Sequence, residues 1–341
     1  YIIFMNTFIR LSFISGLQEI VISEINKISA IEIIDKNDET ISIQCVENID
    51  LIRNLKSITN AHIVVQDKKI NPLYLNNHKS ILGNIIELVL ANNEQQFKTF
   101  IISCAGADSP ELDSIKKYIT ATYKLSENID ADLKINLGKK DTFWELTVCI
   151  TPLPLSVRSY KVSNIPGSLN PTIAYAINSF LNLGEITSYL NIFSGSATLL
   201  IEAELINKNL KLVGIDYDGK RNSEAIKNIK KAGLIKSIKI VKQDIYTALP
   251  SDQYDAIVSD LPFGMKISKD ENLSELYTAF IRYCEKTLIH SGTLVIYTTE
   301  FEILEKIIRN SNFIIEKQVP LKLVTSVDSY LYPKIIMCKF K

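Results

Sequence analysis

The spacing of apolar residues divides the chain into three parts. In the first part, the stretches TFIRLSF, AIEII, TISIQC and AHIVVQ alternate as strands do, whereas GLQEIVISEINKI and NIDLIRNLKSI carry apolar residues at helical spacing. Their order is strand-helix-strand-strand-helix-strand, with a polar turn between the two middle strands. This order predicts a ferredoxin-like α+β domain over residues 1–67.

The second part has its own set of elements. We expect a helix near residues 79–92, the strand FKTFIISC, a second helix over 109–123, and the strands DLKINL and TFWELTVCI. These elements predict another small α+β domain over residues 68–150. Residues 151–168 follow with several prolines and no lasting periodicity, so we expect a linker there.

In the third part, strands alternate with amphipathic helices. Asn170-Pro171 has the pattern of an N-cap and first helical residue before TIAYAINSFLN. The stretches ITSYLNIF, KLVGID, SIKIVK, YDAIVSD and TLVIYTT are five successive predicted strands, and FIIEKQVP with KIIMCKF predicts an antiparallel hairpin at the sheet edge. The alternation is typical of a doubly wound, mainly parallel α/β sheet over residues 169–341.

Composition narrows the function classes. The 341 residues are 46% hydrophobic and 22% charged, as in an ordinary globular protein of two compact domains. Five scattered cysteines and three histidines lack metal-ligand spacing, so we expect reduced thiols and no metal site. The apolar start YIIFM is soon interrupted by polar residues, so we expect no membrane span, no signal peptide and a cytoplasmic location.

Charge limits how a nucleic acid could bind. The chain has 38 Lys+Arg and 38 Asp+Glu, a formal net charge of +0, so any surface for RNA must be a local basic patch. Each lysine cluster has the alternative of being an ordinary solvated face. The candidates are Lys116, Lys117, Lys124, Lys134, Lys139 and Lys140, with Arg158 and Lys161 in the linker.

Small and acidic residues follow the strands of the third part. In NIFSGSATLLIEA, Gly195 and its neighbours join a strand to a helix, where a cofactor can approach backbone N–H groups or the chain can simply turn tightly. Asp216 ends the next strand, where its carboxylate can accept both ribose hydroxyls or cap a helix. Asp244 can contact adenine or form a turn. Since no phosphate-binding loop motif is present, this set favours S-adenosylmethionine, which contains a ribose and adenine but no phosphate.

The strongest signal is Asp260-Leu261-Pro262-Phe263-Gly264 at the end of a hydrophobic strand. Pro262 stiffens the turn and Gly264 relieves it. The Asp260 carboxylate and the Leu261 carbonyl can accept hydrogen bonds from an NH2 group and so direct its lone pair toward a methyl donor, while Phe263 can stack on a flat base. A Pro-Gly turn with a buried phenylalanine is the alternative interpretation.

Together, SGSATLLIEA, VGIDYD, QDIYTA and SDLPFG resemble, in order and spacing, the cofactor and catalytic motifs of the THUMP-domain class I methyltransferases, a family that makes N2-methylguanosine in tRNA. The similarity extends through PLSVRSYKVSNIPGSLNPTIAYAI and, more loosely, through GLQEIVISEI and residues 98–150, which resemble the family's first helix and THUMP module. The resemblance implies a Rossmann-like catalytic domain, with a THUMP-like RNA-binding domain at residues 68–150.

The resemblance also implies roles for individual residues. The target base would be held by Asp260, Pro262 and Phe263, with Leu261 and Gly264 beside it. The cofactor site would comprise Asn170, Pro171, Asn191, Gly195, Ser196, Thr198, Asp216, Asp244 and Asp260.

Two residues depart from the pattern of the family. Asn191 stands where the family usually has Asp, and it brings no negative charge toward the sulfonium or amino group of the cofactor. Ala197 stands where the family usually has Gly, and alanine suits this position only if its φ is not positive.

The predicted function is methyl transfer from S-adenosylmethionine to the exocyclic N2 of a guanosine in tRNA, by a monomer, with a need for a partner subunit left open. The alternatives are an rRNA guanine-N2 methyltransferase, a DNA amino-methyltransferase, a protein glutamine methyltransferase, and a cofactor-binding RNA-binding protein with little activity. Because few core contacts are expected across the linker, we also expect residues 169–341 alone to fold and bind cofactor.

Overall fold

The computed structural model describes residues 7–28, 31–46, 48–67, 70–71, 79–91, 97–105, 109–248, 252–263 and 272–341. The chain divides into two compact units, one of Tyr1–Phe13 with Val21–Ser156 and one of Ile14–Ile20 with Val157–Lys341. Among the described residues, no helix is both long enough and apolar enough to cross a lipid bilayer.

The first half of the N-terminal unit has the predicted β-α-β-β-α-β order. Its strand order β2-β3-β1-β4, with β1 antiparallel to both β3 and β4, gives the ferredoxin-like arrangement. The elements are β1 Thr7–Ser12, α1 Gln18–Ile25, β2 Ile33–Lys36, β3 Thr40–Gln44, α2 Asp50–Arg53 and β4 Asn60–Asp67.

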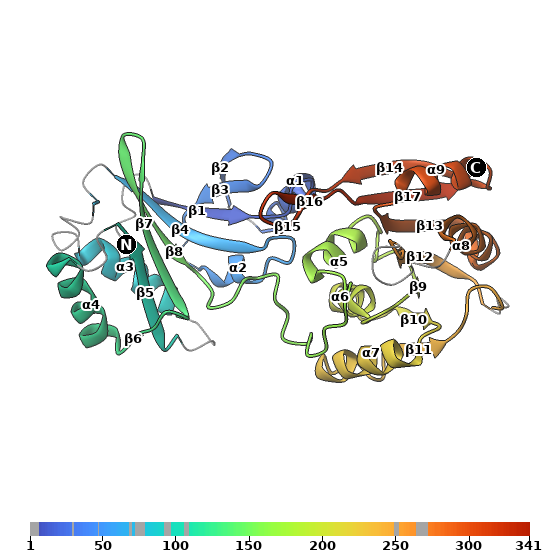
Figure 1. Ribbon diagram of the computed structural model, residues 1–341, viewed down its shortest axis with the longest axis horizontal. Helices are drawn as coiled ribbons and strands as arrows, with labels where there is room; N and C mark the ends of the chain where they lie inside the picture. The colour runs from blue at the N-terminus through green and yellow to red at the C-terminus, as the bar shows by residue number, and fades with distance from the viewer. Residues whose placement is uncertain are drawn as a thin grey trace. The chain divides into compact units, whose positions relative to one another are not determined.

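The second half continues the same sheet. Strand β8 pairs antiparallel with β4, so the full order is β2-β3-β1-β4-β8-β7-β5-β6 (Figure 1). Arg10 on β1 binds both carboxylate oxygens of Glu145 on β8 at 2.8 Å, and this bond ties the two halves together across β4. No break in the sheet marks the predicted division into 1–67 and 68–150. The elements are α3 Lys79–Leu90, β5 Thr99–Cys104, α4 Pro110–Tyr123, β6 Ser126–Glu127, β7 Leu133–Lys140 and β8 Phe143–Cys149.

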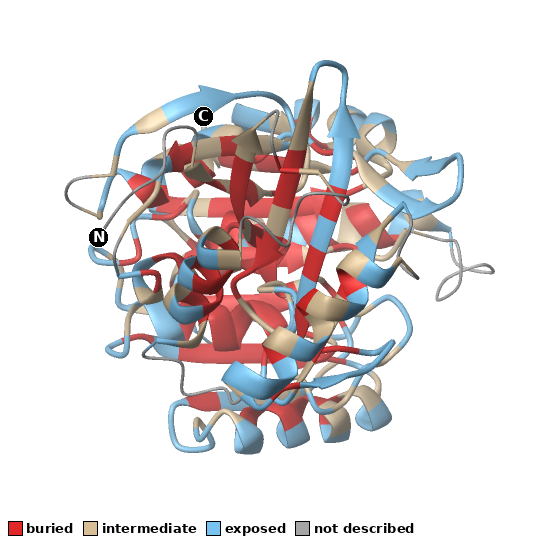
Figure 2. Ribbon diagram, turned by 90° about the vertical axis from the view of Figure 1, so that its left-hand side faces the viewer, coloured by how far each residue is buried: buried red, intermediate tan, exposed pale blue. Residues whose placement is uncertain are grey.

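Burial along β7 explains why these residues form a strand. Its first five positions alternate between buried and exposed, as one face of the sheet packs on the core. The exposed end of the β7–β8 hairpin is visible in Figure 2 and carries Lys139 and Lys140. Two other candidate cations already form ion pairs, Lys116 with Glu127 and Lys117 with Asp113.

The C-terminal unit is a doubly wound α/β fold with a seven-stranded sheet of order β11-β10-β9-β12-β13-β17-β14. All neighbouring pairs from β11 to β13 are parallel, and β14 and β17 form the predicted antiparallel pair, with β14 at the edge. The elements are α5 Pro171–Asn178, β9 Ser188–Ile192, α6 Thr198–Ile206, β10 Lys211–Asp216, α7 Gly219–Lys231, β11 Ile238–Lys242, β12 Tyr254–Asp260, α8 Leu273–Thr287, β13 Leu288–Thr298, α9 Phe301–Arg309, β14 Phe313–Pro320, β15 Leu323–Ser326, β16 Ser329–Leu331 and β17 Lys334–Phe340.

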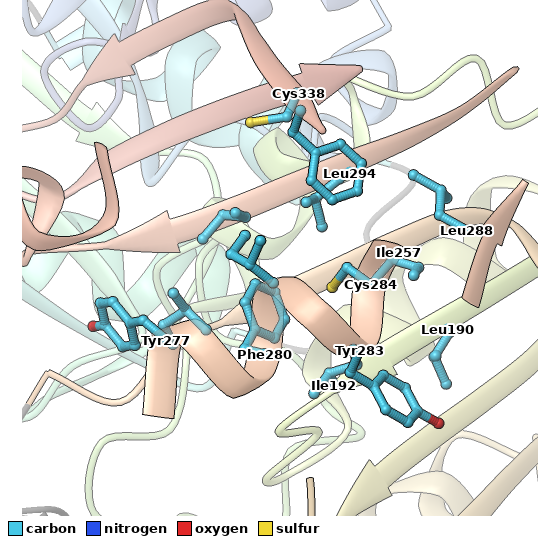
Figure 3. Close-up of a cluster of buried hydrophobic side chains, with 14 of the residues drawn as sticks. Leu190, Ile192, Ile257, Tyr277, Phe280, Tyr283, Cys284, Leu288, Leu294 and Cys338 are labelled. Atoms are coloured by element: carbon cyan, nitrogen blue, oxygen red, sulfur yellow. The ribbon is translucent and has the colours of Figure 1, made fainter. Parts of the chain in front are cut away.

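Helices cover both faces of this sheet, with α5, α6 and α7 on one side and α8 and α9 on the other (Figure 1). The core between the sheet and α8 includes Leu190 and Ile257 from the strands and Tyr277, Phe280 and Cys284 from the helix (Figure 3). This packing fixes the C-terminal ends of β9 and β12 next to each other. The strand order reverses between these two strands, which is where ligands bind in open α/β sheets.

Residues 14–20 pack with the C-terminal unit. Ser15 forms an antiparallel bridge with Lys322, whose N–H donates to the Ser15 carbonyl at 3.2 Å. Gly16 has φ +99°, and a Cβ at this position would lie 2.1 Å from the Pro320 carbonyl oxygen. Glycine is therefore required here by both conformation and space.

Candidate active site

Two cavities lie at the C-terminal ends of β9, β10 and β12. The larger has a volume of about 530 Å³ and is lined by the β9–α6 turn, Asp260 and Phe263, together with residues 165–169 and Leu331. The smaller, of about 120 Å³, is lined by Asp216 and Asp244, among others. Phe193, Arg221 and Pro262 line both cavities, which makes them parts of one site.

The β9–α6 turn lines the larger cavity. Phe193 at φ 56° and Gly195 at φ 49° bend the chain sharply after β9, and the Gly195 N–H donates to Asp216 at 3.0 Å. Ser196 and Thr198 also line this cavity, and their hydroxyl groups lie 2.9 Å apart. The turn rich in small residues is thus part of the cavity lining.

Ala197 is strained by the same turn. It has φ 61° and is fully buried, so the condition that its φ is not positive fails. A residue with a Cβ costs about 1–2 kcal/mol in the left-handed region. The surrounding fold therefore tolerates at Ala197 a conformation that favours glycine.

The Asn191 side chain donates hydrogen bonds that an aspartate at this position could not donate. Its Nδ2 donates to the carbonyls of Ile192 and Val258 at 3.2 and 3.0 Å, bonds that a carboxylate cannot make. Its Oδ1 is buried and accepts no hydrogen bond from the described residues. Asn191 therefore joins β9 to β12 beside the site.

Asp216 and Asp244 meet at the smaller cavity although they follow different strands. Asp216 is only 2% exposed, and its two carboxylate oxygens accept the N–H groups of Gly195 and Asp218, each at 3.0 Å. Asp244 is exposed and accepts the Tyr246 N–H at 2.9 Å. Capping of α7 is done by Asp218, so Asp216 does not serve the alternative helix-capping role considered for it.

Asp260 ends β12 and lines the larger cavity with Leu261, Pro262 and Phe263. Burial raises the pKa of its carboxyl group to about 8, and the nearby Lys161 ammonium opposes this rise. The turn is held firmly, because the Leu261 N–H donates to the Tyr297 carbonyl at 3.0 Å and the Tyr277 hydroxyl donates to the Pro262 carbonyl at 2.8 Å.

The Phe263 ring meets the Tyr297 ring edge-on, with centroids 5.7 Å apart. The Phe263 ring thus lines the larger cavity and packs against the Tyr297 ring. Gly264 lies outside the described residues. Asn170 and Pro171 cap and open α5, and they directly follow the lining residue Leu169 without themselves lining either cavity.

Residues 157–168, here called the crossing segment, belong to the C-terminal unit and do not form a free linker. Arg158 is 9% exposed and its Nε donates to Glu202 on α6 at 3.1 Å, while the Tyr160 hydroxyl donates to the same oxygen at 2.7 Å. Further along, Asn228 on α7 accepts the Ser163 N–H at 2.8 Å. Arg158 thus has a structural partner and does not present its charge to RNA as the sequence suggested.

Replacing Arg158 by Met is expected to lower the free energy of unfolding by about 3–5 kcal/mol, because Glu202 would remain buried without its cation. Denaturant unfolding followed by circular dichroism measures the loss. The double variant Arg158→Met/Glu202→Met should recover most of it. Lys211→Met, which removes an exposed ion pair with Asp252, is the control and should cost less than about 1 kcal/mol. Equal losses in Arg158→Met and Lys211→Met would contradict the structural role.

Sequence reasoning missed several residues of the site. Ser194, Arg221 and Leu331 line the larger cavity, as do residues 165–168 of the crossing segment. The partner of Arg158 could have been suspected from the sequence. Glu202 is an acidic residue inside the apolar helix TLLIEAELI, and a buried carboxylate needs a buried partner. Among the described residues, no group of three or more His, Cys, Asp and Glu side chains is placed to hold a metal ion.

The fold and this site define the class of the C-terminal unit, a class I methyltransferase domain. TrmN from Thermus thermophilus has the same fold as this chain, with a TM-score of 0.74 at 18% sequence identity, over 98% of this chain and 100% of that one. Residues 158–326 match the family model UPF0020, described as RMKL-like, methyltransferase domain. The match covers just under half of the chain.

Curated relatives match part of the chain at higher sequence identity. The chain is 28% identical over 170 residues to the U6 snRNA (guanine-N(2))-methyltransferase THUMPD2 of Bos taurus, covering 50% of this chain and 32% of that protein. It is 24% identical over 249 residues to a tRNA (guanine(6)-N2)-methyltransferase of Methanocaldococcus jannaschii, covering 59% of this chain and 65% of that protein. The chain therefore aligns with about a third of the length of the first relative and just under two thirds of the length of the second.

Proposed function

We propose that this chain transfers a methyl group from S-adenosylmethionine to the exocyclic N2 of a guanosine in structured RNA, with tRNA as the first candidate. One observation carries the proposal: Asp260 and its rigid turn face the same cavity as the β9–α6 turn held by Asp216. The relatives described above support this choice of acceptor, because their names describe methyltransferases of guanine N2 in tRNA or in U6 snRNA.

The residues present fit this cofactor. The Ser194 hydroxyl is buried and lacks a hydrogen-bond partner among the described residues, yet Ser194 lines the larger cavity, so it can bind a polar group there. The larger cavity has the volume of a small-molecule site. Asp216 and Asp244 would hold the ribose and adenine, and Gly195, Ser196 and Thr198 would face the methionine end.

The proposed methyl transfer depends on where hydrogen-bond acceptors lie around the target base. The cofactor, when bound, supplies a methyl group on a sulfonium, which the N2 lone pair takes as the carbon–sulfur bond breaks, and N2 then gives up one proton. Asp260 accepts a hydrogen bond from the amino group and draws its lone pair out of conjugation. Phe263 provides an aromatic face for the base, and the hydrogen bonds to Tyr277 and Tyr297 hold the turn so that little reorganisation is needed.

The N-terminal unit would position the RNA. We propose that residues 68–150 act as the THUMP-like part, and that the exposed lysines at the end of the β7–β8 hairpin contact phosphates. This division of work agrees with a chain of zero net charge, in which only a local patch can attract RNA.

The test is methylation of purified tRNA, rRNA and small nuclear RNA with isotopically labelled S-adenosylmethionine, followed by nucleoside mass spectrometry. We expect label in N2-methylguanosine and the highest rate on tRNA. Label confined to rRNA would select the rRNA alternative. Label in N6-methyladenosine, in DNA or in protein glutamine would overturn the proposed acceptor, and cofactor binding without any transfer would support the binding protein.

A further inference from the structure

The β15–β16 hairpin, residues 322–332, joins β14 to β17 (Figure 1) and carries exposed apolar and aromatic side chains. Val327 at its turn is 92% exposed, and Val324, Tyr330 and Tyr332 are exposed as well. Elsewhere in the described part of the C-terminal unit, exposed large apolar residues occur singly or as one adjacent pair along the chain. Four of them within nine residues indicate a binding surface.

One face of the hairpin belongs to the catalytic cavity. Leu331 on β16 lines the larger cavity together with Asp260 and Phe263. Successive side chains of a strand point to opposite faces, so Tyr330 lies on the other face of the hairpin. Its ring and that of Tyr332 are neighbours, with centroids 6.4 Å apart. The hairpin therefore presents two aromatic rings directly beside the site where the target base is proposed to bind.

A lysine accompanies the two rings. The Lys322 ammonium lies 4.2 Å from the centroid of the Tyr330 ring, and among the described residues it forms no ion pair with a carboxylate. Tyr330 is still 43% exposed, so part of its ring remains open to a ligand. Exposed aromatic rings with a cation beside them suit single-stranded nucleic acid, because bases stack on the rings and the cation attracts phosphate.

Backbone hydrogen bonds hold the base of the hairpin. The Leu321 N–H donates to the Pro333 carbonyl at 2.8 Å, and the Lys322 N–H donates to the Ser15 carbonyl at 3.2 Å. Nearer the turn, the Thr325 hydroxyl donates to the Ser329 carbonyl at 3.1 Å. The rings are thus presented from a hydrogen-bonded support, which reduces the entropy lost when a ligand binds.

We propose that the β15–β16 hairpin binds unpaired nucleotides next to the target guanosine, with Tyr330 and Tyr332 stacking on bases and Lys322 contacting a phosphate. The inference rests on the proposed function, since it needs RNA as substrate, and it specifies that the RNA is single-stranded at this point. A base that reacts in a closed cavity must leave its stack, and its neighbours then need other surfaces on which to stack. The position of Leu331 in the cavity wall and the charge of Lys322 favour RNA over a protein as the occupant.

The first experiment measures RNA binding without catalysis. Fluorescence anisotropy of the full chain is recorded with two labelled probes, an RNA stem-loop with an unpaired loop and a blunt RNA duplex of the same length. We expect Tyr330→Ala/Tyr332→Ala to weaken binding of the stem-loop by about 5- to 150-fold, while binding of the duplex changes little. Unchanged affinity for the stem-loop would overturn the proposal and leave a protein as the occupant of the hairpin.

Three variants separate stacking from other causes of such a loss. Tyr330→Phe/Tyr332→Phe should bind the stem-loop like the parent, because the ring and not the hydroxyl group stacks on a base. Ile314→Ala removes an exposed apolar side chain from β14 and should have no effect. Lys322→Met should reduce the slope of log Kd against log salt concentration by about 0.7, the value for one phosphate contact with a single strand. An unchanged slope would remove the phosphate contact from the proposal.

The second experiment measures methylation kinetics with the same alanine variant. We expect its KM for the RNA substrate to rise, with kcat at saturating RNA and the affinity for S-adenosylmethionine little changed. If the parent methylates guanosine and the KM of the variant is unchanged, the role of the hairpin is refuted and the proposed function stands. If the parent methylates no guanosine but the variant loses affinity for the stem-loop, the proposed acceptor is refuted and the role of the hairpin stands.

Discussion

Asp260→Ala is expected to reduce methyl transfer by a factor of about 100 or more while leaving cofactor affinity nearly unchanged. Removal of one preorganised hydrogen-bonding group from a dry site typically costs this much in rate. Asp260 lies at the end of β12, and Asp216, the proposed ribose acceptor, lies at the end of β10. The variant should therefore alter the face proposed for the base and not the face proposed for the nucleoside of the cofactor. Single-turnover rates and calorimetric titration with S-adenosylmethionine measure the two quantities.

A matched control is Asp252→Ala, which removes an exposed carboxylate just before the same strand. Its rate should stay within about a factor of two of the parent, because surface ion pairs contribute little. Asp260→Asn keeps an acceptor oxygen without charge and should fall between the parent and the alanine variant. More than about a tenth of the parental activity in Asp260→Ala would remove Asp260 from the mechanism.

Asp216→Ala is expected to weaken S-adenosylmethionine binding by about 5- to 150-fold, the equivalent of about 1–3 kcal/mol for hydroxyl groups left without their acceptor. The effect has a second source here, because Asp216 also holds the N–H of Gly195 and so fixes the β9–α6 turn that lines the cavity. Calorimetric titration with the cofactor gives the dissociation constant.

Asp218→Ala separates these effects from the loss of a helix cap. Asp218 caps α7 two residues later, and its loss should lower the free energy of unfolding by about 1 kcal/mol with little change in cofactor affinity. An unchanged dissociation constant in Asp216→Ala would reduce Asp216 to a structural residue of the turn.

The order of helices and strands could be predicted because the spacing of apolar residues within each short segment indicates whether it forms a helix or a strand. The parallel strands of the C-terminal unit are short segments rich in apolar residues; Asp216 and Asp260 end two of them, and Asp244 lies two residues after a third. The carboxyl ends of parallel strands share one sheet edge, so these three residues had to come together. The continuous N-terminal sheet was not predictable in this way, since the β4–β8 pairing joins distant strands.

The crossing segment shows why the rest was missed. It has no periodicity, so its sequence does not reveal which side chains turn inward, and Arg158 and Lys161 were interpreted as candidate RNA-binding charges of a linker. Its contacts to Glu202 and Asn228 are specific hydrogen bonds between distant positions, which local patterns do not record. The positive φ of Ala197 likewise depends on the shape of the β9–α6 turn.

These contacts also correct one expectation. A fragment that starts at residue 169 would lack the wall formed by residues 165–168 and would leave Glu202 without Arg158. It would also lack Ile14–Ile20, which group with the C-terminal unit. We therefore no longer expect residues 169–341 alone to fold and bind cofactor as the intact chain does.

The pairing of Ser15 with Lys322 has a consequence for protein synthesis. On the ribosome, residues 14–20 emerge long before the segment around Pro320 and Lys322 that receives Gly16 is translated. Leu17, which is fully buried in the folded chain, therefore lacks its final environment until this later segment has been made, a period in which nascent chains are exposed to aggregation. A premature stop before Pro320 would yield a product that contains every motif of the active site and still presents this apolar segment to chaperones and proteases.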